Sequence, residues 1–152
     1  MTDLELVRQA DVKIDNMLCF ALYAASRQAV ESYRPLLDKL DLTYPQYLTL
    51  LLLWEREPRT IKEIGGILYL DSGTLSPLLK RLEKKGLIKR QRDAQDERLV
   101  NISLTGAGWA MQEQVKELPE TLFCQIGWPI EEFASLVEKL HRLTDRILET
   151  HK

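Results

Sequence analysis

Apolar residues recur at three- and four-residue steps through the first forty residues, and this spacing predicts one long helix. Pro35 should bend or end that helix near Tyr33, because proline lacks the backbone donor that a helix interior needs. A second helix is expected after Thr43, with Pro45 in its first turn and Pro58 stopping it. It is apolar on nearly every side and should therefore be the central buried helix. The apolar positions of the first helix are Val12, Met17, Leu18, Ala21, Leu22, Ala25, Ala29 and Val30.

Residues 60–86 predict two further helices joined by a tight turn. Thr60 and Glu63 have the spacing of a capping box at the start of a short helix. The next helix can be capped by Asp71 or Ser72, and a glycine ends it. Its buried side is predicted from leucines at helical spacing, which are Leu75, Leu78, Leu79 and Leu82.

After residue 86 the spacing of the apolar residues changes from that of a helix to that of β-strands. Segments 87–92 and 98–105 can each form a strand, and the acidic stretch between them predicts a hairpin. The apolar set of the second strand is Leu99, Ile102 and Leu104, an imperfect alternation.

Helices are predicted again after the hairpin. Thr105 should cap one that is interrupted or kinked near Pro119, and Pro129 should open the last. The last helix carries apolar residues at positions 133, 136, 137, 140, 143 and 147.

Composition places the chain among globular proteins of one domain, or of one core with an arm. The longest apolar block has eight residues, so no membrane span is expected. The first residues lack the basic start and apolar stretch of a secretory signal, and the two cysteines lie far apart in sequence. A reducing, cytoplasmic setting is therefore expected.

The net charge of −2 hides an asymmetry. Residues 56–98 carry eleven Lys or Arg against seven Asp or Glu, which leaves −6 for the rest of the chain. Within residues 80–92, seven basic side chains accompany one acidic side chain. Such a block indicates one face built for an anion, although a solvated helix end is an alternative.

A short helix, a turn, a second helix and a hairpin follow one another as in a winged helix-turn-helix. The second helix begins with short hydrogen-bonding side chains that suit base edges in the major groove, and its later basic residues suit phosphates. We expect it to contact DNA through Asp71, Ser72, Thr74, Ser76, Lys80, Arg81 and Lys84. Beyond it, Lys85, Lys89, Arg90 and Arg92 continue the basic run.

The hairpin tip holds Asp96 and Arg98. An arginine there can enter the minor groove, where the potential is most negative, and an aspartate two residues earlier can fix its direction. The wing contacts would then be Arg90, Arg92, Asp96 and Arg98. The alternative is a surface salt bridge on an ordinary hairpin.

Residues 71–108 resemble the winged helix of MarR-type regulators. Residues 82–88 match the end of the family's recognition helix, and Asp96-Glu97-Arg98 matches its D-x-R wing tip. The resemblance implies a mainly α fold with a small β-hairpin wing and a homodimer whose first and last helices interlock around a two-fold axis. It places the dimerisation region at 1–42 and 105–152 and the DNA-binding region at 43–104. Each subunit would read half of a pseudo-palindromic double-stranded operator.

A narrower likeness is to the OhrR-type repressors, which sense organic hydroperoxides. Segments 18–27, 33–55 and 69–88 carry it. By this likeness Cys19 is the redox-sensing thiol and is surrounded by Tyr23 and Tyr33. The likeness also makes Cys124 the resolving cysteine, which bonds across subunits on oxidation. If the reduced protein holds the two sulfurs far apart, disulfide formation must move helices.

The residues themselves leave the role of Cys19 open. Tyr23 lies four positions later on the same helix face and can donate a hydrogen bond to a thiolate. Tyr33 lies about 21 Å farther along the axis than Cys19, so it could reach only the cysteine of a second chain. Most cysteines in helices are simply packed, and Cys19 and Cys124 can both be read as core residues.

Other chemistry has less support. The only histidines, His141 and His151, do not form a cluster with metal-ligand spacing, and no phosphate-binding glycine motif occurs, so no cofactor is expected. The sequence favours a thiol-based repressor over a MarR-type repressor that binds a small aromatic or lipophilic effector. A thiol peroxidase is a third possibility, but it leaves the basic winged helix unexplained, and no enzyme is expected.

Overall fold

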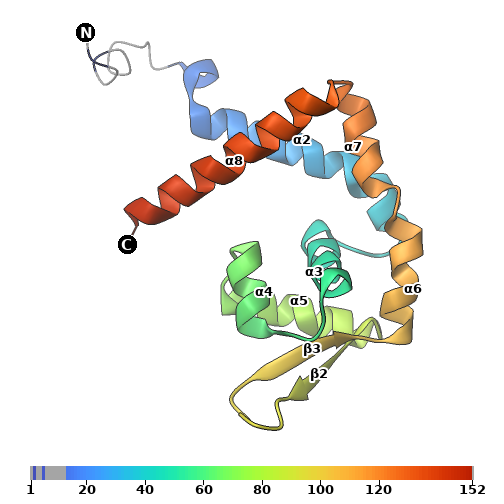
Figure 1. Ribbon diagram of the computed structural model, residues 1–152. Coiled ribbons are helices and arrows are strands. Elements are labelled where there is room, and N and C mark those ends of the chain that lie inside the picture. The colour runs from blue at the N-terminus through green and yellow to red at the C-terminus, as the bar shows by residue number, and fades with distance from the viewer. Residues whose placement is uncertain (1, 3–4, 6–12, 152) are drawn as a thin grey trace. The chain divides into compact units, whose positions relative to one another are not determined.

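The computed structural model describes residues 2, 5 and 13–151, and these fall into two units, Met1–Lys116 and Glu117–Lys152. Among the described residues of the first unit, a short 3-10 helix precedes five α-helices and three strands (Figure 1). The elements are η1 (Ile14–Asn16), α2 (Leu18–Lys39), α3 (Tyr44–Glu55), β1 (Arg59–Thr60), α4 (Ile61–Leu68), α5 (Ser72–Lys84), β2 (Ile88–Arg92), β3 (Val100–Leu104) and α6 (Gly106–Val115). The second unit holds α7 (Leu118–Ile126) and α8 (Ile130–Thr150).

Helix α2 differs from the expected helix at both ends. It begins at Leu18, after η1 and the extended Met17, and the predicted apolar position Val12 lies outside the described residues. Pro35 is predicted to bend or end the helix near Tyr33, and it does not end it, because α2 continues to Lys39. Leu37, just beyond the proline, is buried, and its carbonyl accepts a hydrogen bond from Leu42. This packing and closure hold the last turn in place.

Helix α3 is the central buried helix, as its sequence predicts. Thr43 caps it through a full capping box with Gln46, whose side chain accepts from the Thr43 amide at 3.0 Å. Helices α4, α5 and α6 and strand β3 all pack against α3. The side chains most completely removed from solvent in the first unit are Thr49, Leu50, Leu53, Ile64, Leu75, Leu79, Leu82, Ile88 and Ile102.

The two helices of the helix-turn-helix have the predicted caps and packing. Thr60 and Glu63 form the predicted capping box of α4, and Asp71 caps α5. Between them Tyr69 has a left-handed conformation with φ of 55°. A β-carbon on Gly65 would lie 2.8 Å from the Leu70 carbonyl oxygen, so glycine lets the turn pack closely against α4. The four leucines predicted as the buried side of α5 are buried.

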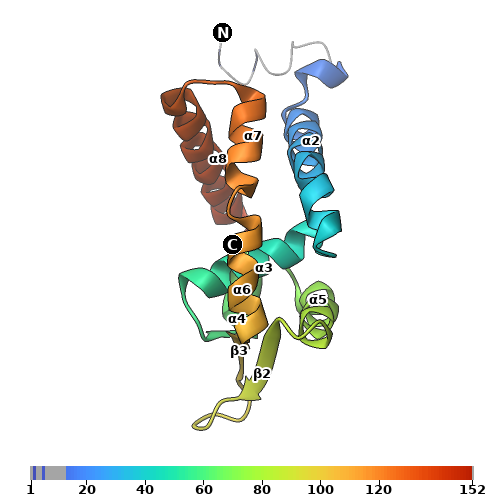
Figure 2. The same cartoon turned by 90° about the vertical axis from the view of Figure 1, so that its right-hand side faces the viewer.

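The predicted hairpin forms from β2 and β3, which pair with Ile88 opposite Leu104 and Arg92 opposite Val100. It projects away from the helices of its unit (Figure 2). The structure adds a third strand, β1, on the far edge of β3, so the sheet order is β1-β3-β2. Leu99 precedes β3 and is exposed, so its assignment to the apolar set of the strand is wrong, whereas Ile102 and Leu104 are buried.

The predicted interruption near Pro119 is present, because α6 ends at Val115 and α7 begins at Leu118. Thr105 caps α6 as expected, and Pro129 immediately precedes α8. Helix α6 starts very close to the residue that precedes β2, since a β-carbon on Gly108 would clash with the Leu87 carbonyl oxygen. The Trp54 indole donates to the Gly108 carbonyl at 3.0 Å.

The described residues form a mainly α fold with a small antiparallel sheet, and the order α4, turn, α5, β2, β3 is that of a winged helix-turn-helix. No helix among them is long and apolar enough to span a membrane.

Candidate functional site

The start of α5 presents a row of short polar side chains. The Asp71 carboxylate accepts a hydrogen bond from the Thr74 amide at 2.7 Å, so one of its oxygens is occupied by the helix cap. Ser72 and Thr74 are exposed, and Ser76 is half-buried. Farther along, Lys80, Arg81 and Lys84 are exposed and lie away from the leucine side of the helix.

The basic residues beyond α5 fall into two groups, those held by acidic neighbours and those that are exposed. Lys85 binds the Asp41 carboxylate at 2.9 Å and also the Asp41 carbonyl, which ties it to the end of α2. Arg90 is half-buried on β2, with a guanidinium nitrogen 4.0 Å from the Glu83 carboxylate. Its Nε is buried without a hydrogen-bond partner among the described residues. Lys89 and Arg92 are exposed, so they are more accessible to a partner than Lys85 or Arg90.

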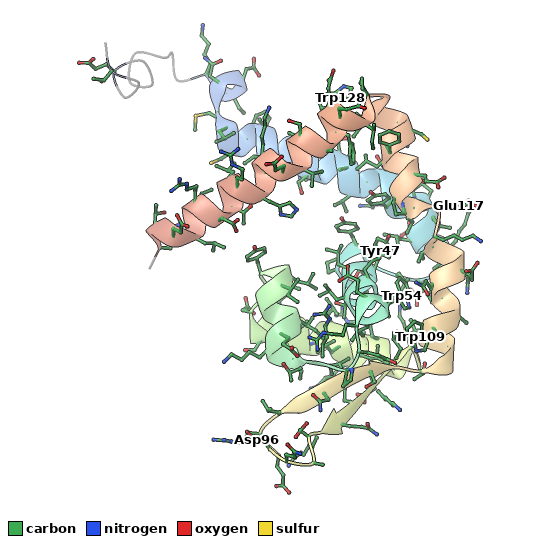
Figure 3. The ribbon with its side chains drawn as sticks, viewed as in Figure 1. Tyr47, Trp54, Asp96, Trp109, Glu117 and Trp128 are labelled. Carbon is green, nitrogen blue, oxygen red and sulfur yellow. The ribbon has the colours of Figure 1, made fainter. Side chains whose placement is uncertain are left out.

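At the tip of the wing, Asp96 and Arg98 form an ion pair with several hydrogen bonds. The Asp96 carboxylate accepts from Arg98 Nε at 3.0 Å, from a terminal guanidinium nitrogen at 3.1 Å and from the Arg98 amide at 3.1 Å. The side chain of Arg98 is nonetheless 90% exposed. Its hydrogen bonds lower the pKa of Asp96, so the carboxylate stays charged and the guanidinium keeps its direction. Figure 3 shows Asp96 at the far end of the hairpin.

Sequence reasoning missed Asp93, which organises the same loop. Its carboxylate accepts from the amides of Gln95 at 2.9 Å and Asp96 at 3.1 Å. Its other oxygen accepts from the Asn101 side chain at 2.9 Å. These bonds lower the pKa of Asp93, the Gln95 amide most. An aspartate at the start of a hairpin turn commonly accepts hydrogen bonds from the backbone amides two and three residues later. This local sequence signal could have identified Asp93.

A groove of about 800 Å³ separates the helix-turn-helix from the wing. Lys62 in the first turn of α4, Ser72 at the start of α5 and Arg98 of the wing all line it. Leu70, Leu75 and Val100 form part of its apolar floor. Lys62 was not among the predicted contacts, because its proximity to the wing depends on the packing of α4 against β3.

Cys19 is the second residue of α2 and is exposed, which excludes the alternative of a packed core cysteine within this chain. Tyr23, one turn later, is 57% exposed. Arg27, one further turn along, donates to the Tyr23 hydroxyl oxygen at 2.7 Å. The Arg27 guanidinium carbon also lies 5.5 Å from the centre of the Tyr23 ring.

Tyr33 lies on the same continuous helix as Cys19, about 21 Å away along its axis, so the two residues of one chain do not meet. It stacks on Tyr44 instead, with ring centres 5.5 Å apart and planes inclined by 10°. Burial, and then the neighbouring Tyr44, raise the pKa of Tyr33, which keeps its phenol protonated.

Cys124 is exposed on α7, in the second unit. Its neighbour Phe123 packs edge-to-face against Phe133 of α8, with ring centres 5.3 Å apart. The packing of Phe123 therefore fixes α7 to α8 while the thiol of Cys124 stays accessible. Among the described residues, no three His, Cys, Asp or Glu side chains gather as metal ligands would.

Comparisons with known proteins agree with this arrangement. The family model for the transcriptional regulators SarA/Rot matches residues 31–118. The chain is 51% identical over 138 residues to the organic hydroperoxide resistance transcriptional regulator of Bacillus subtilis, covering 86% of this chain and 94% of that protein.

Solved structures of AbfR, a protein of Staphylococcus epidermidis, are also similar. Reduced AbfR bound to DNA has a TM-score of 0.75 at 37% identity, covering 97% of this chain and 99% of AbfR. Overoxidised AbfR bound to DNA has a TM-score of 0.73 at 36% identity, covering 96% and 99%. Disulfide-formed AbfR has a TM-score of 0.63 at 38% identity, covering 92% and 98%. The chain belongs to the SarA/Rot family of transcriptional regulators, winged-helix proteins of the MarR type.

Proposed function

We propose that this protein is a redox-sensing repressor that binds an operator as a reduced homodimer and releases it when an organic hydroperoxide oxidises Cys19. The observation that carries the proposal is an exposed free thiol in the first turn of α2, one turn before a tyrosine. The first turn of a helix is a position at which a negative charge is stabilised, and the thiolate is the reactive form of cysteine. The names of the Bacillus regulator and of the AbfR redox states support the same chemistry.

In the DNA-bound state, the exposed side of α5 enters the major groove. Ser72, Thr74 and Ser76 face base edges, while Lys80, Arg81 and Lys84 contact phosphates. Arg98, held by Asp96, enters the neighbouring minor groove. The groove lined by Lys62, Ser72 and Arg98 then holds the phosphate backbone that passes between the two base contacts.

The thiol site needs a second chain. One subunit supplies Cys19, and the distance along α2 prevents Tyr33 of that same subunit from reaching it. A homodimer that packs α2 against its counterpart brings Tyr33 of the partner subunit to the thiol. Its raised pKa supports a donor role, since a protonated phenol can hydrogen-bond to a thiolate.

The sensing reaction is a displacement at a peroxide oxygen. The Cys19 thiolate attacks the terminal oxygen, an S–O bond forms and the O–O bond breaks. The alkoxide leaves with the electron pair and takes up a proton to become the alcohol, while the sulfur becomes a sulfenic acid. Leu18 and Phe20 flank the thiol with exposed apolar surface, which favours an organic hydroperoxide over hydrogen peroxide. Equal rate constants for the two oxidants would contradict this preference.

Cys124 of the partner subunit resolves the sulfenic acid. Its thiolate attacks the Cys19 sulfur, an S–S bond forms, and the hydroxyl group takes up a proton and leaves as water. A disulfide requires Cα atoms about 4.4–6.8 Å apart. Its formation therefore fixes α7 to the start of the other subunit's α2, and the resulting movement withdraws the two α5 helices from their half-sites.

The test follows the sulfur chemistry in the wild type and in Cys19→Ser and Cys124→Ser variants treated with cumene hydroperoxide. On a non-reducing gel, the wild type should form a covalent dimer and both variants should not. Mass spectrometry of Cys124→Ser should find oxygen added at Cys19. A covalent dimer of Cys19→Ser equal to that of the wild type would contradict the proposal and favour a repressor that responds to an effector.

A further inference from the structure

Cys19, Tyr23 and Arg27 form a row along one face of α2 at successive four-residue steps. The last two are joined by the 2.7 Å hydrogen bond from the Arg27 guanidinium to the Tyr23 hydroxyl oxygen. The guanidinium also lies over the Tyr23 ring, at 5.5 Å from its centre. Arg27 is not among the residues that the sequence singles out for the thiol site.

The direction of this hydrogen bond follows from the chemistry of the two groups. A guanidinium has only donors, so the phenol oxygen must accept, and its single proton remains available for another acceptor. Cys19 lies one helical turn before Tyr23 on the same face, at the spacing at which side chains of a helix meet. In the proposed thiolate site, donation would therefore run from Arg27 to Tyr23 and from Tyr23 to Cys19.

Accepting from a cation makes the phenol a stronger donor, because successive hydrogen bonds polarise one another. Tyr33 has a different setting, since its ring stacks on Tyr44 and burial raises its pKa. The two tyrosines of the site thus differ: Tyr23 is polarised by a cation, and Tyr33 is kept neutral by burial.

We infer that Arg27 is a positioning residue of the peroxide sensor, which acts through the Tyr23 hydroxyl to stabilise the Cys19 thiolate. The inference rests on the proposed function and deepens it. Arg27 contacts neither the peroxide nor the sulfur, so its effect passes through the phenol oxygen. Removal of Arg27 should slow the oxidation of Cys19 without abolishing it.

The test uses the full chain with Cys124→Ser, so that Cys19 is the one remaining thiol. Two quantities are measured at neutral pH: the ultraviolet absorbance of the thiolate and the rate of reaction with cumene hydroperoxide. Arg27→Gln should lower the absorbance and slow the reaction by about two- to fivefold, because one polarising bond changes a charge-assisted hydrogen bond by only a fraction of its strength. Arg27→Lys, which restores charge and one donor, should recover part of both.

Arg34→Gln is the matched control. It removes the same charge from the exposed surface of the same helix, where Arg34 pairs with Glu31 at 2.8 Å. It should leave the absorbance and the rate unchanged. Equal losses of thiolate absorbance and reaction rate in Arg27→Gln and Arg34→Gln would mean that only the net charge of the helix matters. That result would overturn the inference.

Tyr23→Phe keeps the aromatic ring and removes the oxygen, and therefore tests the route. Adding Arg27→Gln to Tyr23→Phe should have no further effect on either quantity. Additive losses would overturn the inference, as would wild-type behaviour of Arg27→Gln. Failure of the proposed function has a different signature, since Cys19→Ser would then still leave DNA when treated with peroxide.

Discussion

At the residue scale, two aspartates and one arginine define the end of the wing. Asp93 binds the turn amides and Asn101, while Asp96 binds the Arg98 side chain. Acidic side chains beside the arginine that we propose enters the minor groove would otherwise repel phosphates. Here both carboxylates are occupied by donors of the hairpin itself. The hydrogen bonds to Asp96 hold the solvent-exposed guanidinium of Arg98 in one direction. This orientation compensates for the repulsion between the carboxylates and phosphates.

Arg98→Ala should weaken operator binding roughly tenfold to a hundredfold, as expected for the loss of one specific groove contact. Asp96→Ala should weaken it less, because the guanidinium remains but loses its direction. Fluorescence anisotropy with an operator selected from random duplexes measures both. Arg146→Ala on α8 is the control, since that arginine belongs to the second unit and pairs there with Glu149. Arg98→Ala with wild-type affinity would remove the wing from the interface.

Lys62 tests the groove between the helix-turn-helix and the wing. Lys62→Gln should lower affinity by a similar factor for all DNA sequences and reduce the salt slope of log K by about one, as a single lost phosphate contact does. Lys139→Gln, on the exposed surface of α8, should change neither quantity. An unchanged salt slope for Lys62→Gln would mean that the groove does not hold the backbone.

At the element scale, the caps and the leucine side of α5 were predictable because they depend on residues close in sequence. Thr43, Thr60, Asp71 and Thr105 all cap the helices expected of them. Strand β1 was not predictable, since two residues show no alternation and pair with β3 some forty positions later. The start of α2 after η1 and its passage through Pro35 likewise depend on packing that no local pattern reveals.

The capping box of α4 gives a prediction with a pH dependence. The Thr60 amide and then Arg56 lower the pKa of Glu63 to about 2 from the ordinary value of 4.5. A depressed folded-state pKa contributes stability that is fully present above pH 4.5 and is lost as the pH falls towards 2. Glu63→Ala should therefore lower the free energy of unfolding by about 0.5–1 kcal/mol at pH 7.

Chemical denaturation of the wild type and Glu63→Ala between pH 2 and 7 measures this difference. It should shrink as the pH falls, because the wild-type carboxylate then becomes protonated. Glu97→Gln at the wing tip, whose side chain caps no helix, is the control. A difference that stayed constant across the range would mean that the charge of Glu63 does not contribute.

At the scale of the whole molecule, two features of the chain support the proposed homodimer. Helix α8 has no fully buried residue, and its apolar side chains are 37–46% exposed at Leu136, Val137, Leu140, Ile147 and Leu148. The proposed thiol site would also be incomplete within one chain, because Tyr33 lies about 21 Å from Cys19 along the axis of α2. The sequence could place each of these residues on its helix. Whether residues of two chains come into contact depends on dimerisation, which local sequence patterns do not encode.

Leu140→Asp should convert the dimer to a monomer and weaken operator binding, because a charge would replace apolar surface that the proposed dimer buries. Analytical ultracentrifugation at several concentrations measures the first effect and anisotropy the second. Glu138→Gln, on the opposite side of α8, should leave the dimer intact. A monomeric wild type, or a dimeric Leu140→Asp with full affinity, would contradict the two-chain site.

The most direct measurement is operator release by peroxide, followed by anisotropy for the reduced wild type and for Cys19→Ser in the same titration. Both proteins should bind the operator with similar affinity before oxidant is added, because Cys19 lies outside the helix-turn-helix and wing. Cumene hydroperoxide should then release the wild type, a thiol reductant should restore its binding, and Cys19→Ser should stay bound throughout. Release of Cys19→Ser at the same peroxide concentration as the wild type would contradict the account.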